Sequence, residues 1–267
     1  MIVVGPALLF CPADRFDRCA KAAERADSVI IDLEDAVAPA DKAAARANLS
    51  NLQLDSRTTI VRVNPVGTAD HDADLVTLST TPYTTVMLAK AESVAQVDAL
   101  SDFRVIALCE TAVGVERAEE LARHPAVVGL MWGAEDLIAS LGGRSSRFAD
   151  GSYRDVARHA RARVLLAARA AGKAAIDAVY VDIADTTGLR AEVDDAAASG
   201  FTATACIHPS QVEIIRAGYA PTPDEVQWAR EVLDLAKQES GVFRFRGQMV
   251  DEPILRQARQ MLSASRG

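Results

Sequence analysis

The chain has 267 residues, of which 49% are apolar and 25% charged, and its formal net charge is −8. This composition is typical of a globular protein with a large core, and the negative field argues against nucleic acid as a partner. Four scattered cysteines without metal-ligand spacing are expected to be reduced and buried. The apolar amino terminus is too short to cross a membrane and lacks a basic region, so we expect a first buried strand and a cytoplasmic protein without membrane contact.

Eight short apolar runs recur along the chain and are typical of strands in a parallel sheet that is covered on both faces. They lie at 7–10, 29–33, 59–63, 85–88, 105–108, 127–132, 175–181 and 201–207. Segments with helical spacing separate many of these runs, at 14–26, 41–49, 93–100, 115–122 and 153–171.

Strand-like runs that alternate with helical segments predict an α/β fold, a closed (β/α)8 TIM barrel over residues 1–221. An open doubly wound sheet is the main alternative, because the same alternation allows it. Asp14 and Ser93 are predicted to cap helices at their amino-terminal ends, and Gly172 and Gly200 to end helices.

The alternation stops near residue 222. Two further helical stretches flank a turn that is rich in aromatic residues and glycine. The stretches are 223–238 and 253–263, and the turn contains Phe243, Phe245, Gly247 and Gln248. We expect residues 222–267 to form a C-terminal helical extension that packs on its own barrel or on a neighbouring one.

Polar residues end most of the apolar runs. In a (β/α)8 barrel the carboxyl ends of the strands form the mouth that carries the chemistry. The polar residues at these ends are Asp32, Glu34, Asp35, Arg62, Asn64, Lys90, Glu110, Glu135, Asp136 and His208. Their convergence on one mouth predicts an active site there. The chain has no dinucleotide fingerprint, P-loop, nucleophile elbow or HExxH helix, which disfavours the corresponding enzyme classes.

Glu110 and Asp136 follow consecutive strands, so closure of the barrel would place them side by side. Two close carboxylates repel each other, and a hard divalent cation such as Mg²⁺ relieves this repulsion with oxygen ligands. Each acid has an alternative role as a solvated loop residue or a helix cap. The spacing alone does not decide between these interpretations.

Arg62 stands between two valines at the end of a strand, where its guanidinium needs an anion. The anion is either a substrate carboxylate or one of the acids that end the preceding strand, and the sequence alone slightly favours the internal ion pair. Lys90 has the same alternative. His208 precedes a proline at a turn and is interpreted as a hydrogen-bonded turn residue.

Eight strings, in order along the chain, make the sequence resemble the HpcH/HpaI aldolase and citrate lyase β-subunit family, in particular its stand-alone members. The strings are LFCPADR (9–15), IDLEDAV (31–37), VRVN (61–64), LAKAE (88–92), ALCETAVG (107–114), WGAEDL (132–137), IHPSQV (207–212) and GQMVD (247–251). They cover almost the whole chain.

The resemblance implies a (β/α)8 barrel with extra carboxy-terminal helices, assembled as a homotrimer or hexamer. It implies that Glu110 and Asp136 hold Mg²⁺ and that Arg62 binds the substrate carboxylate. It also implies that Asp251 is an acid–base residue that can enter the site of an adjacent subunit, although from the sequence alone Asp251 is a helix cap.

Further roles are assigned on the same basis. Glu34 and Asp35 are expected either to orient metal-bound water or Lys90, or to be purely structural. Lys90 and Arg15 are candidate substrate-binding residues. The candidates for the phosphates of coenzyme A are Arg15, Arg18, Lys21, Arg144 and Arg147.

The resemblance therefore implies a Mg²⁺-dependent carbon–carbon lyase that cleaves or forms a β-hydroxyacyl-CoA thioester of the citramalyl, malyl, citryl or hydroxymethylglutaryl type. The products of cleavage would be a small keto acid and acetyl-CoA. One alternative is a citrate lyase β subunit that acts on an acyl-carrier thioester. Others are a thioester-hydrolysing malate synthase and a non-catalytic acyl-CoA-binding scaffold.

Overall fold

The computed structural model describes residues 4–239 and 241–264, and the chain divides into two compact units. The first unit ends at Arg216 and contains a barrel, and the second begins at Ala217 and contains the carboxy-terminal helices. In the described part of the chain, no helix is both long and apolar enough to cross a bilayer.

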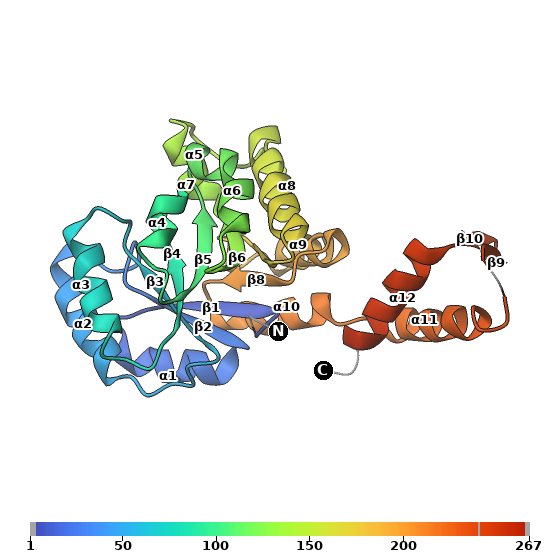
Figure 1. The fold of residues 1–267 in the computed structure, drawn as a ribbon, viewed down its shortest axis with the longest axis horizontal. Coiled ribbons are helices and arrows are strands. Elements are labelled where there is room, and N and C mark those ends of the chain that lie inside the picture. The colour runs from blue at the N-terminus through green and yellow to red at the C-terminus, as the bar shows by residue number, and fades with distance from the viewer. Residues whose placement is uncertain (1–3, 240, 265–267) are drawn as a thin grey trace. The chain divides into compact units, whose positions relative to one another are not determined.

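The first unit is a closed barrel of eight parallel strands in sequence order, in which β1 pairs with both β2 and β8 (Figure 1). This confirms the predicted fold and excludes the open sheet. The strands are β1 (Ala7–Pro12), β2 (Ser28–Asp32), β3 (Thr59–Val63), β4 (Thr85–Leu88), β5 (Arg104–Cys109), β6 (Val127–Trp132), β7 (Ala174–Asp177) and β8 (Ala203–Cys206).

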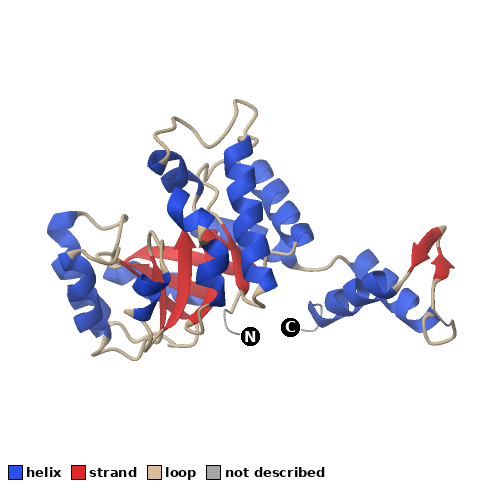
Figure 2. Ribbon diagram, turned by 45° about the horizontal axis from the view of Figure 1, so that its top comes forward, coloured by secondary structure: helices blue, strands red, loops and turns tan. Residues whose placement is uncertain are grey.

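The barrel forms because its strands are apolar on both faces. One set of side chains fills the interior, with Leu8, Ile30, Met87 and Ile176 among its fully buried members. The opposite faces pack under the helices that surround the strands in Figure 2. All four cysteines are free and buried, as expected.

The prediction for the seventh strand was too long. β7 stops at Asp177, although the apolar run continues to position 181. The Asp177 carboxylate accepts hydrogen bonds from the backbone N–H of Ala178 (3.1 Å) and from Trp132 Nε1 (2.6 Å). The bond from the Ala178 N–H replaces the hydrogen bond that this amide would make to a neighbouring strand, so the strand ends here.

Helices follow the strands around the barrel. They are α1 (Phe16–Arg25), α2 (Lys42–Asn51), α3 (Ala69–Leu78), α4 (Val94–Asp98), α5 (Ala112–Glu116), α6 (Ala118–Arg123), α7 (Ala134–Ser140), α8 (Asp155–Ala170), α9 (Thr186–Ser199) and α10 (Val212–Tyr219), with short 3₁₀ turns η1 (Pro39–Asp41) and η2 (Pro209–Gln211). The helix expected at 115–122 is in fact two short helices.

The predicted helix ends were mostly correct. Ser93 caps α4 in a reciprocal capping box with Gln96, and Gly200 ends α9 in the left-handed conformation (φ 102°). The prediction for Asp14 was wrong. α1 begins one residue later than that cap requires, with Arg15 at the N-cap position and no side-chain capping bond.

The second unit pairs two helices with a small hairpin. Its elements are α11 (Pro223–Leu235), β9 (Phe243–Phe245), β10 (Gln248–Val250) and α12 (Glu252–Ala264). The hairpin was expected only as a turn. Arg246 (φ 47°) and Gly247 (φ 82°) both have positive φ, which is the pattern of a type I′ turn between antiparallel strands.

Candidate active site

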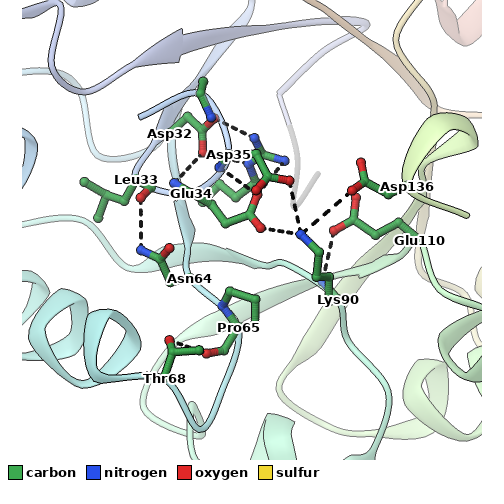
Figure 3. A network of polar contacts seen from close by, with 12 residues as sticks. Asp32, Leu33, Glu34, Asp35, Asn64, Pro65, Thr68, Lys90, Glu110 and Asp136 are labelled. Atoms are coloured by element: carbon green, nitrogen blue, oxygen red, sulfur yellow. Dashed lines mark hydrogen bonds and ion pairs between the residues drawn. The ribbon is translucent and has the colours of Figure 1, made fainter. Parts of the chain in front are cut away.

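The carboxyl ends of β2 to β6 bring six of the predicted residues together at the mouth of the barrel. Arg62 lies in β3, Lys90 follows β4, Glu110 directly follows β5, and Asp136 lies in the first turn of α7. Glu34 and Asp35 lie in the turn after β2. Figure 3 shows that the side chains from this turn, Lys90 and the Glu110–Asp136 pair point toward one another.

Glu110 is a buried acid with another acid beside it. The residue is 2% exposed, and its carboxylate accepts a hydrogen bond from the backbone N–H of Lys90 at 3.0 Å. Burial, followed by the charge of Asp136, raises the pKa of Glu110 from 4.5 to about 8. The site thus favours either a proton or a cation at Glu110.

Gly133 makes this arrangement possible. A Cβ at position 133 would lie 2.9 Å from Glu110 Cβ and 3.0 Å from Glu110 Oε2. The end of β6 can therefore approach the Glu110 carboxylate closely only because residue 133 has no side chain. This close approach lets α7, which carries Asp136 and begins directly after Gly133, start next to Glu110.

The donor set at this pair fits Mg²⁺. Mg²⁺ takes oxygen ligands and usually binds through one or two carboxylates, with water or substrate oxygens in its remaining positions. Within residues 4–239 and 241–264, no three His, Cys, Asp or Glu side chains form a group that could hold a metal. A metal at Glu110 and Asp136 would therefore need further ligands from water or substrate.

Arg62 is held in an internal ion pair, as the sequence alone had favoured. Its Nε and Nη2 donate to the two carboxylate oxygens of Asp32 at 2.7 and 2.5 Å, and its Nη1 lies 3.3 Å from Glu34 Oε2. Its guanidinium carbon lies 4.9 Å from the centre of the Phe10 ring. Burial opposes the charge, but the hydrogen bonds to Asp32 raise the pKa of Arg62 above its ordinary value. Asp32 thus fixes Nε and Nη2, and a substrate anion could reach Nη1 only by sharing it with Glu34 or by replacing Glu34 there.

Lys90, which follows β4, contacts acids that follow β2 and β6. Its ammonium donates to Glu34 Oε1 and to Asp35 Oδ2 (3.1 Å), and it lies 3.8 Å from Asp136 Oδ1. Its backbone is left-handed (φ 51°), which costs a non-glycine residue about 1 kcal/mol. Burial opposes the charge, but the bond to Glu34 raises the pKa of Lys90 above its usual range. Lys90 is thus a fixed cation between the acids of β2 and the Glu110–Asp136 pair.

Three other predicted residues lie outside this group. Arg15 stands at the N-cap position of α1, with its side chain 59% exposed and its Nε 3.6 Å from Asp14. Asp251 belongs to the second unit, where its Oδ1 accepts a 3.4 Å hydrogen bond from the backbone N–H of Ile254 and caps α12. His208 is a hydrogen-bonded turn residue, as predicted, since its Nδ1 accepts from the Ser210 backbone N–H.

A cavity of about 300 Å³ lies between the ends of β1 and β8 and the outer helix α1. Phe10 and Pro12 line its β1 side, and three cationic residues of α1 line another. These are Arg18, Lys21 and Arg25. Arg18 and Lys21 were predicted as phosphate ligands. Arg25 was missed because basic residues are common near the end of a helix.

Arg147, another predicted phosphate ligand, is paired with Glu192, and its guanidinium carbon lies 3.8 Å from the centre of the Tyr153 ring.

Two residues that support the site were also missed. Lys42, the first residue of α2, and Asp74, inside α3, are both hydrogen-bonded around Asn64. A lysine at a helix start and an aspartate in a helix give no sequence signal that separates them from solvated residues.

The chain matches one family over most of its length. The model of the HpcH/HpaI aldolase/citrate lyase family matches residues 7–209. A citrate lyase subunit beta-like protein from Mycobacterium tuberculosis (strain ATCC 25618 / H37Rv) is 57% identical over 97% of this chain and 94% of its own length. The mitochondrial citramalyl-CoA lyase of Mus musculus is 31% identical over 96% of this chain and 85% of its own.

A solved structure with the same fold supports these matches. The crystal structure of the protein CitE from Mycobacterium tuberculosis, in complex with magnesium, acetoacetate and coenzyme A, is 55% identical in sequence. It superimposes with a TM-score of 0.97 and covers 100% of both chains.

Proposed function

Because this chain belongs to the HpcH/HpaI aldolase/citrate lyase family, we propose that it is a Mg²⁺-dependent lyase that cleaves or forms the carbon–carbon bond of a β-hydroxyacyl-CoA thioester. The observation that carries this proposal is the pairing of Glu110 and Asp136 beside Arg62 and Lys90 at one barrel mouth. The candidate substrates are citramalyl-, malyl-, citryl- and hydroxymethylglutaryl-CoA, which would give a small keto acid and acetyl-CoA.

Glu110 and Asp136 are the residues that would hold Mg²⁺. When bound, the ion supplies Lewis-acid polarisation and orients the hydroxyl and acid oxygens of the substrate. The protein supplies the rest of the geometry. Arg62 presents Nη1 to the substrate carboxylate while Asp32 fixes the other nitrogens of its fork. Lys90 lies where it can contact the same end of the substrate and balance the acids around it.

The chemistry is a retro-Claisen/aldol cleavage of a β-hydroxy thioester. Transfer of the hydroxyl proton to water forms the carbonyl of the keto acid, the bond to the thioester's α-carbon breaks, and its electron pair becomes the enolate of acetyl-CoA. We assign Asp251 as the acid that protonates this enolate, and as the base that removes the same proton in the condensing direction. This role requires the second unit, residues 217–267, to fold over a barrel mouth, either its own or that of an adjacent subunit.

We place the phosphates of coenzyme A at the cavity beside α1. Arg18, Lys21 and Arg25 give this cavity three positive charges, and Phe10 offers an apolar surface at the end of β1. The CitE structure from Mycobacterium tuberculosis contains coenzyme A, which favours the same ligand here. Arg15 is exposed at the start of the same helix and is retained as a candidate substrate contact.

We further propose a cytoplasmic homotrimer or hexamer, in which Asp251 of one subunit serves the site of another. Light scattering coupled to gel filtration measures the assembly directly. A monomer at micromolar concentration would rule out this part of the proposal and require that Asp251 serves its own barrel.

A mass-spectrometric time course on the four CoA thioesters, with Mg²⁺ or with EDTA, tests the activity. We expect Mg²⁺-dependent release of acetyl-CoA and a keto acid, and its loss in Glu110→Gln and Asp136→Asn. Glu120→Gln, at an exposed glutamate on α6, is the matched control and should behave as the wild type. A folded wild-type protein that binds Mg²⁺ but turns over none of the thioesters would contradict the proposal.

The same assay separates the alternative functions. Free coenzyme A that appears together with malate would identify a thioester-hydrolysing malate synthase. Turnover restored only by an acyl-carrier protein thioester would identify a citrate lyase β subunit. Binding of CoA thioesters that survives Glu110→Gln and Asp136→Asn, without turnover in the wild type, would identify a binding scaffold.

A further inference from the structure

Lys42 lies behind the active-site turn rather than in it. Its ammonium donates three hydrogen bonds, to the carbonyl oxygens of Leu33 (2.9 Å) and Glu34 (3.1 Å) and to Asn64 Oδ1 (2.6 Å). All three donors of the ammonium are thereby used, and two of them hold the backbone of the turn that follows β2. One residue of α2 thus joins this turn to the end of β3.

Asn64 completes the link from the β3 side. Its Nδ2 donates to Leu33 O (2.9 Å) and to Asp74 Oδ2 (2.7 Å), and its backbone N–H donates to the same oxygen of Asp74 at 2.9 Å. Asp74 is fully buried and is also paired with Arg46 at 3.2 Å. This set of side chains is anchored in α2 and α3, outside the barrel mouth.

The turn that Lys42 holds carries the acid that contacts both cations of the site. Glu34 Oε1 accepts from Lys90, and Glu34 Oε2 lies 3.3 Å from Arg62 Nη1. Asp32 occupies Nε and Nη2 of Arg62, so a substrate carboxylate would bind at Nη1 and share that nitrogen with Glu34. A shift of the Glu34 backbone therefore moves the carboxylate that lies against this nitrogen and against the Lys90 ammonium. Figure 3 shows Glu34 and Lys90 side by side.

We propose that Lys42 is a positioning residue for the substrate-carboxylate contact. It acts through Glu34 on Arg62 and Lys90, with Asn64 as its partner, and it touches no substrate itself. The inference rests on the proposed function, because it assigns Lys42 to the part of the site that receives the keto-acid end.

A positioning role for Lys42 can be told apart from a general stabilising role by which ligand loses affinity when Lys42 is replaced. Glu110 follows β5 and Asp136 lies in α7, and among the described residues Lys42 makes no hydrogen bond to either segment, so it reaches this pair only indirectly, through Glu34 and Lys90. Loss of Lys42 should therefore weaken the binding of a keto acid much more than the binding of Mg²⁺. A residue that merely stabilised the fold would affect both alike.

The fold is expected to survive the loss of Lys42. Without its ammonium, Leu33 O still accepts from Asn64 Nδ2, and Glu34 O still accepts from the Val37 backbone N–H at 3.1 Å. Neither carbonyl of the turn is left without a donor. The expected defect is a looser turn rather than an unfolded barrel.

Calorimetry on the full chain tests the inference, with Mg²⁺ titrated first and acetoacetate then titrated at saturating Mg²⁺. Lys42→Met should raise the Kd of acetoacetate by roughly 10- to 100-fold, by analogy with residues that orient metal ligands, and change the Kd of Mg²⁺ by less than about threefold. Lys42→Arg keeps the charge but changes the donor geometry, and should give an intermediate Kd. Lys173→Met, just before β7 at the opposite end of the barrel, is the control and should match the wild type.

Three outcomes overturn the inference. Unchanged acetoacetate affinity in Lys42→Met sinks it while leaving the lyase proposal intact, and so does an equal loss of Mg²⁺ and acetoacetate binding. If the wild type binds both ligands but cleaves no thioester, the lyase proposal fails. The changes in acetoacetate and Mg²⁺ affinity in Lys42→Met still decide the role of Lys42. A wild-type protein that binds no keto acid with Mg²⁺ present overturns both.

Discussion

Replacing Glu110 by glutamine should make the metal-free protein more stable at neutral pH. Burial and the neighbouring Asp136 raise the pKa of Glu110 from 4.5 to about 8. Between these values the folded chain binds more protons than the unfolded chain, so the free energy of unfolding falls as the pH rises. Glutamine has nearly the same shape, still accepts the hydrogen bond from the Lys90 backbone, and carries no charge.

The size of the gain follows from the difference in pKa. Each unit is worth about 1.4 kcal/mol, so the buried carboxyl costs the wild type on the order of 3 kcal/mol at pH 7 and about 1 kcal/mol at pH 5. These free energies are upper values, because the protein around the ionised carboxylate can rearrange to stabilise the charge. For a chain of this size 1 kcal/mol moves Tm by about 2–4 °C, so the variant should melt at most roughly 6–12 °C above the wild type at pH 7.

Thermal unfolding in EDTA between pH 5 and 8.5 measures this difference. The gap between Glu110→Gln and the wild type should widen with pH, whereas Glu120→Gln, at an exposed site, should show no such trend. Added Mg²⁺ should stabilise the wild type and leave Glu110→Gln unchanged. A gap that stays constant with pH, or a variant that is less stable than the wild type at pH 8, would refute the reasoning that Glu110 is held as an unfavourable charge.

Three further predictions concern the other parts of the site. Gly133→Ala places a Cβ 2.9 Å from Glu110 Cβ, so it should destabilise the fold by about 1–3 kcal/mol in thermal unfolding and weaken Mg²⁺ binding in calorimetry, and unchanged Mg²⁺ affinity would count against the pair. Asp251→Asn should abolish turnover but not Mg²⁺ binding, and mixing it with Glu110→Gln should restore part of the activity if Asp251 serves an adjacent subunit. Arg18→Ala should raise KM for a CoA thioester several-fold but not for the same acyl group on pantetheine, and equal effects on both would remove Arg18 from the phosphate site.

The sequence predicts the barrel well because each strand has its own evidence. Eight runs are apolar on both faces, and the structure turns all eight into strands of one closed barrel. The errors lie where local polar contacts decide the outcome. β7 ends early because the Asp177 side chain captures the next backbone amide, and the hairpin in the second unit was missed because its strands have three residues each.

How much of the site could be predicted from the sequence differs from residue to residue. Glu110 and Asp136 follow adjacent strands, so closure of the barrel brings them together as expected. For Arg62 the spacing could not tell a substrate anion from an internal one, and the structure shows the internal pair with Asp32. The sequence contains no indication of Lys42, because its role depends on the direction of the Leu33 and Glu34 carbonyls, and no sequence pattern encodes that direction.

The closed ring of strands divides the barrel mouth into two arcs. The polar residues proposed to handle the acyl end come from β2 to β6, while the cationic cavity lies at β1 and β8. Neighbours in a closed barrel are fixed, so these arcs meet at only two seams. We therefore expect directed evolution to change the preferred acyl group through substitutions on the β2–β6 arc. The β1 and β8 arc would keep its proposed contacts to coenzyme A. The proposed placement of the two substrate parts therefore allows the acyl-binding residues to change while the contacts to coenzyme A stay the same.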